Sequence, residues 1–427
     1  MLRSRIWRAG LAVALVTGLV AWWQHRETPR DDGTITLVFA HAKHPRYAFL
    51  SDLVRRFEQE HPGVRVREQV LPASTDEQHQ FYVLNLPAGA ADIDLIDMDI
   101  IWVPEFARAG WLTELTPHVP QNELAPLHPA ARTVDRLDGR LYAVPWFVDA
   151  GVLYYRRDLL EKYGFSPPQS YPELLHQAQH ILAQEKDPRL TGFLWQGMQY
   201  EGLVCSALEF IRGNGGEVLR GGRSALREPQ TEEALRFMSA MIRTEHVTPA
   251  LVTTLNEEAS RHIFQSGRAI FMRNWPYVWR LMQQPDSAVA GRFGLEIVPS
   301  FPGHASVPTM GGFHLGVNSR SRHQKEAIEF LRFMIRHSSQ KEIVLRVGVL
   351  AAHMEVYRDP EVRQAIPFLS DLLPALEQAQ PRPVTPYYLM ISQVLQPELS
   401  AVVAGIRTPE EAMRLADEQV SRLLEAE

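Results

Sequence analysis

The sequence predicts a mixed α/β protein with two lobes, from its length, the alternation of its elements and one unusual strand. A chain of 427 residues exceeds what one hydrophobic core usually holds. Strand and helix patterns alternate from residue 34 to 112, which favours a mainly parallel sheet with helices on both faces. Residues 142–155 read as one long apolar strand with a polar break, followed at once by a helix. Such a strand can cross between lobes, although a core strand with an edge aspartate explains it equally well.

The N-terminal part contains three strand patterns, each followed by a helix. The helix after the first strand places Phe49, Leu53 and Phe57 at helical spacing. Ser74 and Glu77 match a capping box that opens the next helix. We expect strands at 34–40, 64–71 and 91–99 and helices at 47–59, from 75 towards 86, and at 103–112. Ligands of such sheets bind at the carboxyl ends of the strands.

Beyond the long strand the pattern stays mixed, without repeats or a low-complexity linker. Gly164 is placed to end the helix that follows the strand, and Ser170 with Glu173 opens another. We expect further helices from 231, at 257–265, at 325–335 and from 408 to the end, strands at 269–272 and 307–318, and turns at 213–216 and 221–222. Because no linker separates the parts, we expect the second lobe to be interwoven with the first.

The composition excludes several classes of function. The formal charge is −6 and no long Lys/Arg run occurs, which argues against a nucleic-acid partner. The single cysteine, Cys205, rules out an intrachain disulfide and a cysteine-rich metal site. Asp92, Asp94 and Asp97 lack the glycine and terminal glutamate of a calcium-binding EF-hand loop. We therefore expect those aspartates to be solvated or to cap helices, and we expect no metal and no cofactor.

The N-terminus has the pattern of a secretory signal. Three arginines precede the apolar run 9–23, which is short for a membrane span. No small-x-small cleavage site follows at a convincing distance, and no cysteine is available for lipidation. Residues 1–30 are therefore predicted to be a signal peptide or an uncleaved anchor. In either case the body faces an extracytoplasmic compartment, which we expect to be the periplasm.

A series of sequence blocks in a specific order carries a family resemblance. The blocks are VLPASTDEQHQFYV, IDMDIIWVPEFARAGWL, LYAVPWFVDAGVLYYRRDLLEKYG, FLWQGMQYEGLVCSALEFI, FQSGRAIFMRNWPYVW, GGFHLGVN and PRPVTPYY. Together they resemble the family 1 extracellular solute-binding proteins of carbohydrate ABC importers, and within that family the trehalose/maltose-binding proteins. The resemblance spans nearly everything after residue 33.

The resemblance implies a fold and a function. It implies a two-lobed, maltose-binding-protein-like periplasmic-binding-protein fold with the ligand in the interlobe cleft. It implies lobes at 34–147 with a return segment at about 314–355, and at 150–312 with about 356–427. The implied function is delivery of an α-linked disaccharide or related glucoside to the membrane permease subunits of an ABC importer, by hinge closure. A monomer without catalytic activity is expected.

Two aspartates are the first candidate ligand contacts, because carboxylates accept hydrogen bonds from sugar hydroxyls. Asp99 ends a predicted strand, where α/β crevices form, and a helix N-cap is its alternative role. Asp149 is the polar break in the long strand, where an isolated buried charge would be costly. The resemblance places both residues on the ligand.

The other candidates come mainly from the resemblance. Trp275 and Tyr277 flank Pro276, so a loop tryptophan can stack on a sugar ring rather than pack in the core. Gly311 and Gly312 permit close backbone approach, and their amides are implied ligand contacts. Arg382 lies between two prolines, where a surface turn is the plainer interpretation and a ligand arginine the family's.

Two positions depart from the family pattern. Phe313 follows the paired glycines, where tryptophan is common in the family. Arg46 falls where the first loop usually carries an acidic residue, with His41, Lys43 and His44 close by. A guanidinium only donates hydrogen bonds, so an anionic or differently substituted glucoside is one hypothesis. The alternative is that Arg46 points to solvent.

Two other functions stay open from the sequence. A secreted glycoside hydrolase would use Asp99 and Asp149 as paired carboxylates. Against it, further glutamates of a carbohydrate-cleaving site are not evident, and the resemblance is to a non-catalytic family. A binding protein that partners an anchored chemoreceptor would share the same binding chemistry.

Overall fold

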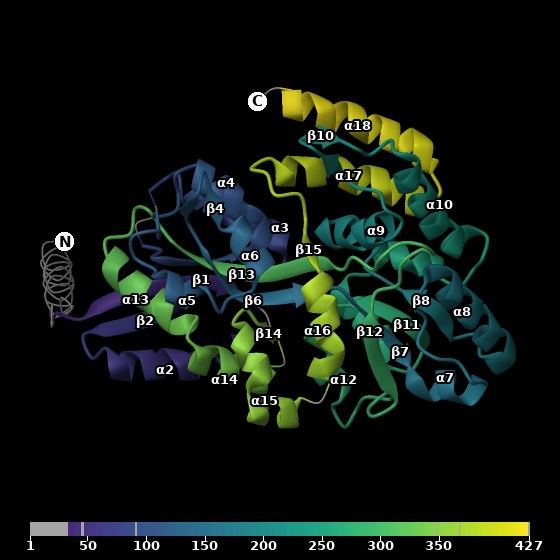
Figure 1. Ribbon diagram of the computed structural model, residues 1–427, viewed down its shortest axis with the longest axis horizontal. Coiled ribbons are helices and arrows are strands. Elements are labelled where there is room, and N and C mark those ends of the chain that lie inside the picture. The colour runs from purple at the N-terminus through teal and green to yellow at the C-terminus, as the bar shows by residue number, and fades with distance from the viewer. Residues whose placement is uncertain (1–32, 44–46, 90–91, 348, 367, 426–427) are drawn as a thin grey trace, which may run out of the picture.

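The computed structural model describes residues 33–43, 47–89, 92–347, 349–366 and 368–425. Figure 1 shows two α/β bodies side by side, joined by strands that run from one to the other. The predicted signal segment, residues 1–30, lies outside the described residues. Among the residues that are described, no helix is both long and apolar enough to span a bilayer.

The first body is built on a seven-stranded sheet in the order β14-β6-β13-β3-β1-β2, with β15 paired to β13. Its strands are β1 (Ile35–Ala42), β2 (Val64–Leu71), β3 (Leu95–Asp99), β6 (Val144–Ala150), β13 (Thr309–Val317), β14 (Leu350–Ala351) and β15 (Gln380–Pro381). Strand β1 pairs in parallel with β2 and β3, whereas β13 runs antiparallel to β3 and β6. The predicted parallel core is therefore present, with an antiparallel return strand inside it.

Helices cover both faces of this sheet (Figure 1). On one side lie α2 (Leu50–Glu60), α13 (Gln324–Met334) and α14 (His337–Val347), and on the other α3 (Thr75–Asn85), α4 (Val103–Arg108) and α6 (Pro129–Val134). Smaller elements are α5 (Gln121–Leu124), α15 (Pro360–Ala365), β4 (Arg136–Leu137) and β5 (Arg140–Leu141). Leu53 and Phe57 of α2 are buried, as their helical spacing predicts.

The second body is built on a four-stranded sheet in the order β12-β7-β11-β8. Its strands are β7 (Val152–Arg156), β8 (Thr191–Leu194), β11 (Ala269–Asn274) and β12 (Phe293–Ile297), and β9 (Leu219–Arg220) pairs with β10 (Arg223–Ser224). Its helices are α7 (Arg157–Tyr163), α8 (Tyr171–Glu185), α9 (Glu201–Gly213), α10 (Pro229–Arg243), α11 (Glu257–Gln265) and α12 (Val278–Met282). The C-terminal helices are α16 (Leu369–Gln378), α17 (Tyr388–Val403) and α18 (Pro409–Glu425); α17 and α18 lie beside α9 and α10 in Figure 1.

Local signals in the sequence set several helix ends. Gly164 has a φ of 73° and ends α7 in the left-handed conformation that glycine tolerates. Ser170 and Glu173 form a complete capping box at α8. Ser74 accepts a hydrogen bond from the amide of Glu77, which caps α3. The predictions at Gly164 and Ser170 are confirmed, and of the capping box predicted at α3 the structure shows the bond to Ser74.

The long apolar strand of the sequence is two strands that belong to different sheets. Strand β6 ends at Ala150 and β7 begins at Val152, so the chain crosses between the bodies at Gly151. The amide of Gly151 donates to the carbonyl oxygen of Thr309, at 3.1 Å, where β13 begins. A Cβ atom at Gly151 would lie 1.9 Å from Oε1 of Glu209. Only glycine therefore fits this crossing as it is packed here.

Other expectations from the sequence were wrong. Asp94 and Asp97 are buried, not solvated or helix-capping. Asp94 accepts from the amide of Val38, at 2.8 Å, and from the hydroxyl of Ser321, while the hydroxyl of Tyr47 donates to Asp97. These aspartates fix loops and strands within the first body. The amphipathic helix expected from residue 231 begins two residues earlier, at Pro229.

Candidate ligand-binding site

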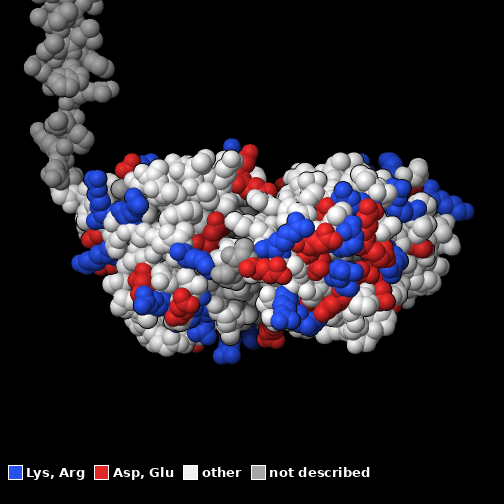
Figure 2. Space-filling view, turned by 90° about the horizontal axis from the view of Figure 1, so that it is seen from above, with Lys and Arg blue, Asp and Glu red and all other residues white. Residues whose placement is uncertain are grey.

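A cavity of about 300 Å³ lies where the two bodies meet, at the carboxyl ends of β3 and β6. In Figure 2, acidic side chains lie along the depression between the two bodies. The predicted site residues that line the cavity are Asp99, Asp149, Trp275, Tyr277, Gly311, Gly312, Phe313 and Arg382. Arg46 lies outside the described residues. The structure thus brings eight predicted positions, from five separate stretches of the chain, around one space.

Asp99 has two partners that hold its carboxylate in place. As the N-cap of the 3-10 helix η2 (Ile100–Trp102), it accepts from the amide of Ile101 at 3.2 Å. It also accepts from Nη2 of Arg382, at 2.7 Å. The N-cap role, which was the alternative prediction for Asp99, is therefore present. It does not exclude ligand binding, because Asp99 also lines the cavity.

Arg382 is a buried guanidinium, not the surface turn that its flanking prolines suggested. It is 4% exposed, and its Nη1 donates to Oε1 of Glu201 at 2.9 Å. Burial by itself lowers the pKa of Arg382, but Asp99, Cys205 and Glu201 together more than offset this, so the pKa is raised and the group stays charged. The Nε atom has no partner among the described residues. Arg382 therefore ties Asp99 to Glu201 and borders the cavity.

Glu201 is a site residue that the sequence reasoning missed. It opens α9 and is 6% exposed, and it accepts from the hydroxyls of Tyr388, at 2.7 Å, and Ser392. Burial raises the pKa of Glu201, while Arg382 opposes that shift. A carboxylate at the start of a helix that is mostly apolar was the available signal.

Trp275 is held in its loop by contacts on several sides. The hydroxyl of Tyr154 donates to its carbonyl oxygen at 3.0 Å, and its indole Nε1 donates to Oε1 of Glu257 at 3.4 Å. The guanidinium of Arg273 lies 4.1 Å from the ring centre, which is a cation–π contact. The ring is half-buried and lines the cavity. It can offer an aromatic surface to a ligand.

The hydroxyl of Tyr277 donates to Oε1 of Glu258 at 2.8 Å, which fixes its ring at the cavity wall. Gly311 and Gly312 of β13 pair with Asp149 and Val148 of β6. Gly312 has a φ of 133°, and a Cβ atom there would lie 2.5 Å from the carbonyl oxygen of Phe147. The close backbone approach that was expected at the paired glycines is therefore an approach of the neighbouring strand β6 to Gly312.

The cavity wall is rich in carboxylates. Asp76, Asp99, Asp149, Glu201, Glu257 and Glu258 line it, against the single cation Arg382 among the described residues there. Asp76, Glu257 and Glu258 were not predicted. The pKa of Asp76 is raised, mainly by burial and further by Asp99. Carboxylates accept hydrogen bonds, so this wall suits a ligand with many hydroxyl groups.

Among the described residues, no group of three or more His, Cys, Asp or Glu side chains is arranged to hold a metal ion. Glu257 accepts from the hydroxyl of Tyr200 at 2.6 Å, and Glu258 is paired with Arg261 at 2.6 Å. Glu257 and Glu258 therefore bind neighbouring side chains of the protein.

Two α/β bodies joined by crossing strands, with a polar cavity between them, define a two-lobed binding protein. The chain belongs to the bacterial extracellular solute-binding protein family, whose model matches residues 41–341. The family resemblance predicted from the sequence blocks is confirmed, and so is an extracytoplasmic location in its general form. The family consists of binding proteins, not enzymes, so the prediction of a non-catalytic protein is confirmed as well.

Several relatives span most of the chain. A probable ABC transporter-binding protein of Deinococcus radiodurans is 34% identical over 369 residues, covering 84% of this chain and 87% of its own length. The structure of T. maritima MalE3 with bound maltose is 35% identical, with a TM-score of 0.86, and covers 91% of this chain and 100% of its own. The maltotriose-binding protein of Pyrococcus abyssi is 25% identical and covers 65% of this chain and 58% of its own. The two-lobed, maltose-binding-protein-like fold is confirmed.

Proposed function

We propose that this protein binds an α-linked disaccharide or a related glucoside in the cavity between its lobes and delivers it to the permease subunits of an ABC importer. The observation that carries the proposal is the composition of the cavity wall. Six carboxylates, one buried guanidinium and one loop tryptophan surround the same space of about 300 Å³. That volume is at the lower end of the range of about 300–1,000 Å³ that is usual for small-ligand sites.

Each wall group has a role in sugar recognition. Asp149 and Asp99 accept hydroxyl hydrogen bonds, and the indole of Trp275 supplies an aromatic face for the C–H surface of a ring. The guanidinium of Arg382 borders the cavity and is a cation that can donate to a sugar oxygen there. Gly311, Gly312, Tyr277 and Phe313 complete the wall. The two similar proteins named for maltose and maltotriose support this ligand class.

The proposal also includes how the two lobes move when the ligand binds. The lobes divide at the crossing 148–151, with 34–147 and about 314–355 on one side and 150–312 and about 356–427 on the other, except that β13 from Thr309, α15 and β15 belong to the first side. Ligand binding closes the lobes as a hinge, and the closed form is the one that the permease receives. The protein works as a monomer in the periplasm. Its N-terminal segment is either cleaved or kept as a membrane anchor.

Titration of the purified protein with a panel of disaccharides tests the proposal. A ligand that binds only the native state raises the melting temperature, and calorimetry then gives the affinity. We expect at least one of maltose, trehalose and related α-glucosides to bind, and chromatography to recover the sugar intact. If no α-glucoside shifts the melting temperature at millimolar concentration, the proposal is wrong. Released monosaccharide would indicate a hydrolase instead.

A further inference from the structure

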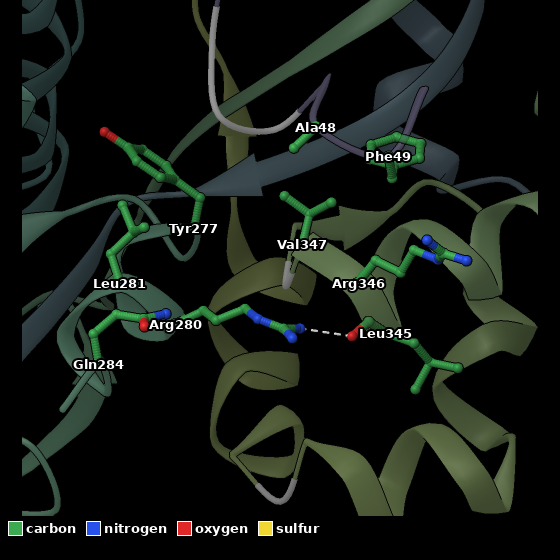
Figure 3. A pocket seen from close by; sticks show the side chains of 9 residues that line it. All are labelled: Ala48, Phe49, Tyr277, Arg280, Leu281, Gln284, Leu345, Arg346 and Val347. Carbon is green, nitrogen blue, oxygen red and sulfur yellow. Dashed lines mark hydrogen bonds between the residues drawn. The ribbon is translucent and has the colours of Figure 1, made fainter. Parts of the chain in front are cut away.

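A second cavity adjoins the proposed sugar cavity. It has a volume of about 510 Å³ and lies between the start of α2, the end of α14 and helix α12. Tyr277 lines both cavities, and Figure 3 shows its ring at one side of the second. In that view the hydroxyl of Tyr277 points away from the second cavity. A ligand that occupied both spaces would have to extend past this ring.

The two cavities carry opposite charge. Six carboxylates line the first, whereas no acidic side chain is among the described residues that line the second. The walls of the second are apolar at Phe49, Leu281 and Leu345, and its charged groups are Arg280 and Arg346. The second cavity therefore lacks, among its described residues, the carboxylates that would bind the hydroxyl groups of a second sugar ring, and its arginines favour an anionic group.

Of its two arginines, Arg280 is the one whose charge has no acidic partner in the described part of the chain. Its Nη1 donates to the carbonyl oxygen of Leu345, at 2.6 Å, and its side chain reaches across the cavity in Figure 3. Arg346, by contrast, is paired with Asp52 and, at 3.1 Å, with Glu342. A guanidinium has five N–H donors in a planar fork, so Arg280 retains donors for a ligand carboxylate.

We propose that the second cavity receives a negatively charged substituent, such as a carboxylate, of a glycoside whose sugar ring occupies the first. This inference rests on the proposed sugar-binding function and adds a charge preference to it. It is independent of Arg46, because it uses described residues alone. Arg280 comes from one lobe and Leu345 from the other, so the anion would be bound where the lobes meet.

A matched pair of ligands tests the inference. Glucosylglycerate and glucosylglycerol carry the same sugar and differ in a carboxylate against a hydroxymethyl group. We expect the wild-type protein to bind the acid at least about tenfold more tightly, and the preference to weaken with salt. Arg280→Gln should remove most of that preference. Because this variant also removes the bond to Leu345 for both ligands, the ratio of the two dissociation constants is the readout.

Arg189→Gln is the matched control, since it removes the same charge from a surface arginine that is paired with Asp187. Its acid preference should equal that of the wild type. Equal affinities for acid and alcohol in the wild type, an unchanged ratio in Arg280→Gln, or an equal loss in Arg189→Gln would each overturn the inference. Maltose is titrated alongside: if it binds while the acid gains nothing, only this inference is wrong, and if no glucoside binds, the proposed function is wrong.

Discussion

Two buried arginines face carboxylates on the same helix, α9, and differ in how completely they are satisfied. Arg273 donates from Nε and Nη2 to Glu209, at 2.8 and 2.6 Å, and from Nη1 to Gln196, at 2.9 Å. Arg382 divides its two Nη groups between Glu201 and Asp99, and its Nε has no partner among the described residues. The hydrogen bonds of the Arg273 guanidinium involve all three of its nitrogen atoms, whereas those of Arg382 involve two.

The difference separates a structural role from a binding role. Glu209 also accepts from the amide of Thr309, at 3.2 Å, so the pair of Arg273 and Glu209 links β11 to the start of β13 next to the crossing. Neither Arg273 nor Glu209 lines the sugar cavity, whereas Arg382, Glu201 and Asp99 all do. We therefore expect the Arg273–Glu209 pair to matter for stability and the Arg382 group to matter for ligand binding.

Breaking the Arg273–Glu209 pair should have the largest effect on stability. Arg273→Met leaves the carboxylate of Glu209 buried without its counter-charge, and we expect the free energy of unfolding to fall by roughly 3–5 kcal/mol. Adding Glu209→Leu should recover a large part of that loss. Urea denaturation measures both. Arg382→Met should cost less, because Asp99 borders the cavity and can be hydrated; an equal or larger loss there would refute the distinction.

Arg382 and Asp149 should matter for ligand affinity. A charge-assisted hydrogen bond contributes roughly 1.5–3 kcal/mol, so Arg382→Ala or Asp149→Ala should weaken sugar binding about ten- to a hundredfold. Calorimetry measures the change, and circular dichroism checks that the fold is intact. Unchanged affinity in both variants would remove the proposed site.

Gly151→Ala tests the crossing itself. The added Cβ atom would lie 1.9 Å from Oε1 of Glu209 and 2.6 Å from Nη2 of Arg273, so this pair must move. Overpacking of this kind costs about 1–3 kcal/mol of unfolding free energy. Gly63→Ala is the control, because a Cβ atom there meets nothing within 4 Å, and we expect a change within about 0.5 kcal/mol. Equal unfolding midpoints for the two variants would contradict the tight crossing.

Cys205, which contacts Nη1 of Arg382 at 3.8 Å, should give the smallest effect. Burial raises the pKa of its thiol from 9.0 to about 12. At pH 8 the native thiolate fraction is then on the order of a thousandfold below that of the unfolded chain. Iodoacetamide should label the protein in urea and not in the native state. Because the native thiol keeps its proton, stability should fall only as the pH rises above 9. Native labelling at the unfolded rate would contradict this burial.

The sequence was a good guide where the determining interactions are local. The end of β3, which positions Asp99, follows from an apolar run, and the caps of α7 and α8 follow from Gly164 and Ser170. The end of β6 was indicated only as a polar break at Asp149, within what was expected to be a single strand. Patterns of this kind depend on residues a few positions apart, so they are visible without a structure.

The missed features depend on contacts between distant residues. Glu201 is held by Arg382, 181 positions away, and by Tyr388 and Ser392 of α17. Helix α17 was not predicted; it contains Pro397, a residue that usually interrupts helices. Asp94 was expected to be solvated because its partner Ser321 is 227 positions away. Burial of polar groups follows from the packing of such pairs, and no local pattern records it.

Small-angle X-ray scattering, with and without a saturating sugar identified by titration, tests most directly whether the cleft between the lobes closes on its ligand. If the lobes hinge at 148–151, the radius of gyration should fall when the sugar is added, and the scattering curve should return to the first form when the sugar is dialysed away. Identical curves for the free and the saturated protein would mean a rigid cleft and would contradict binding by hinge closure.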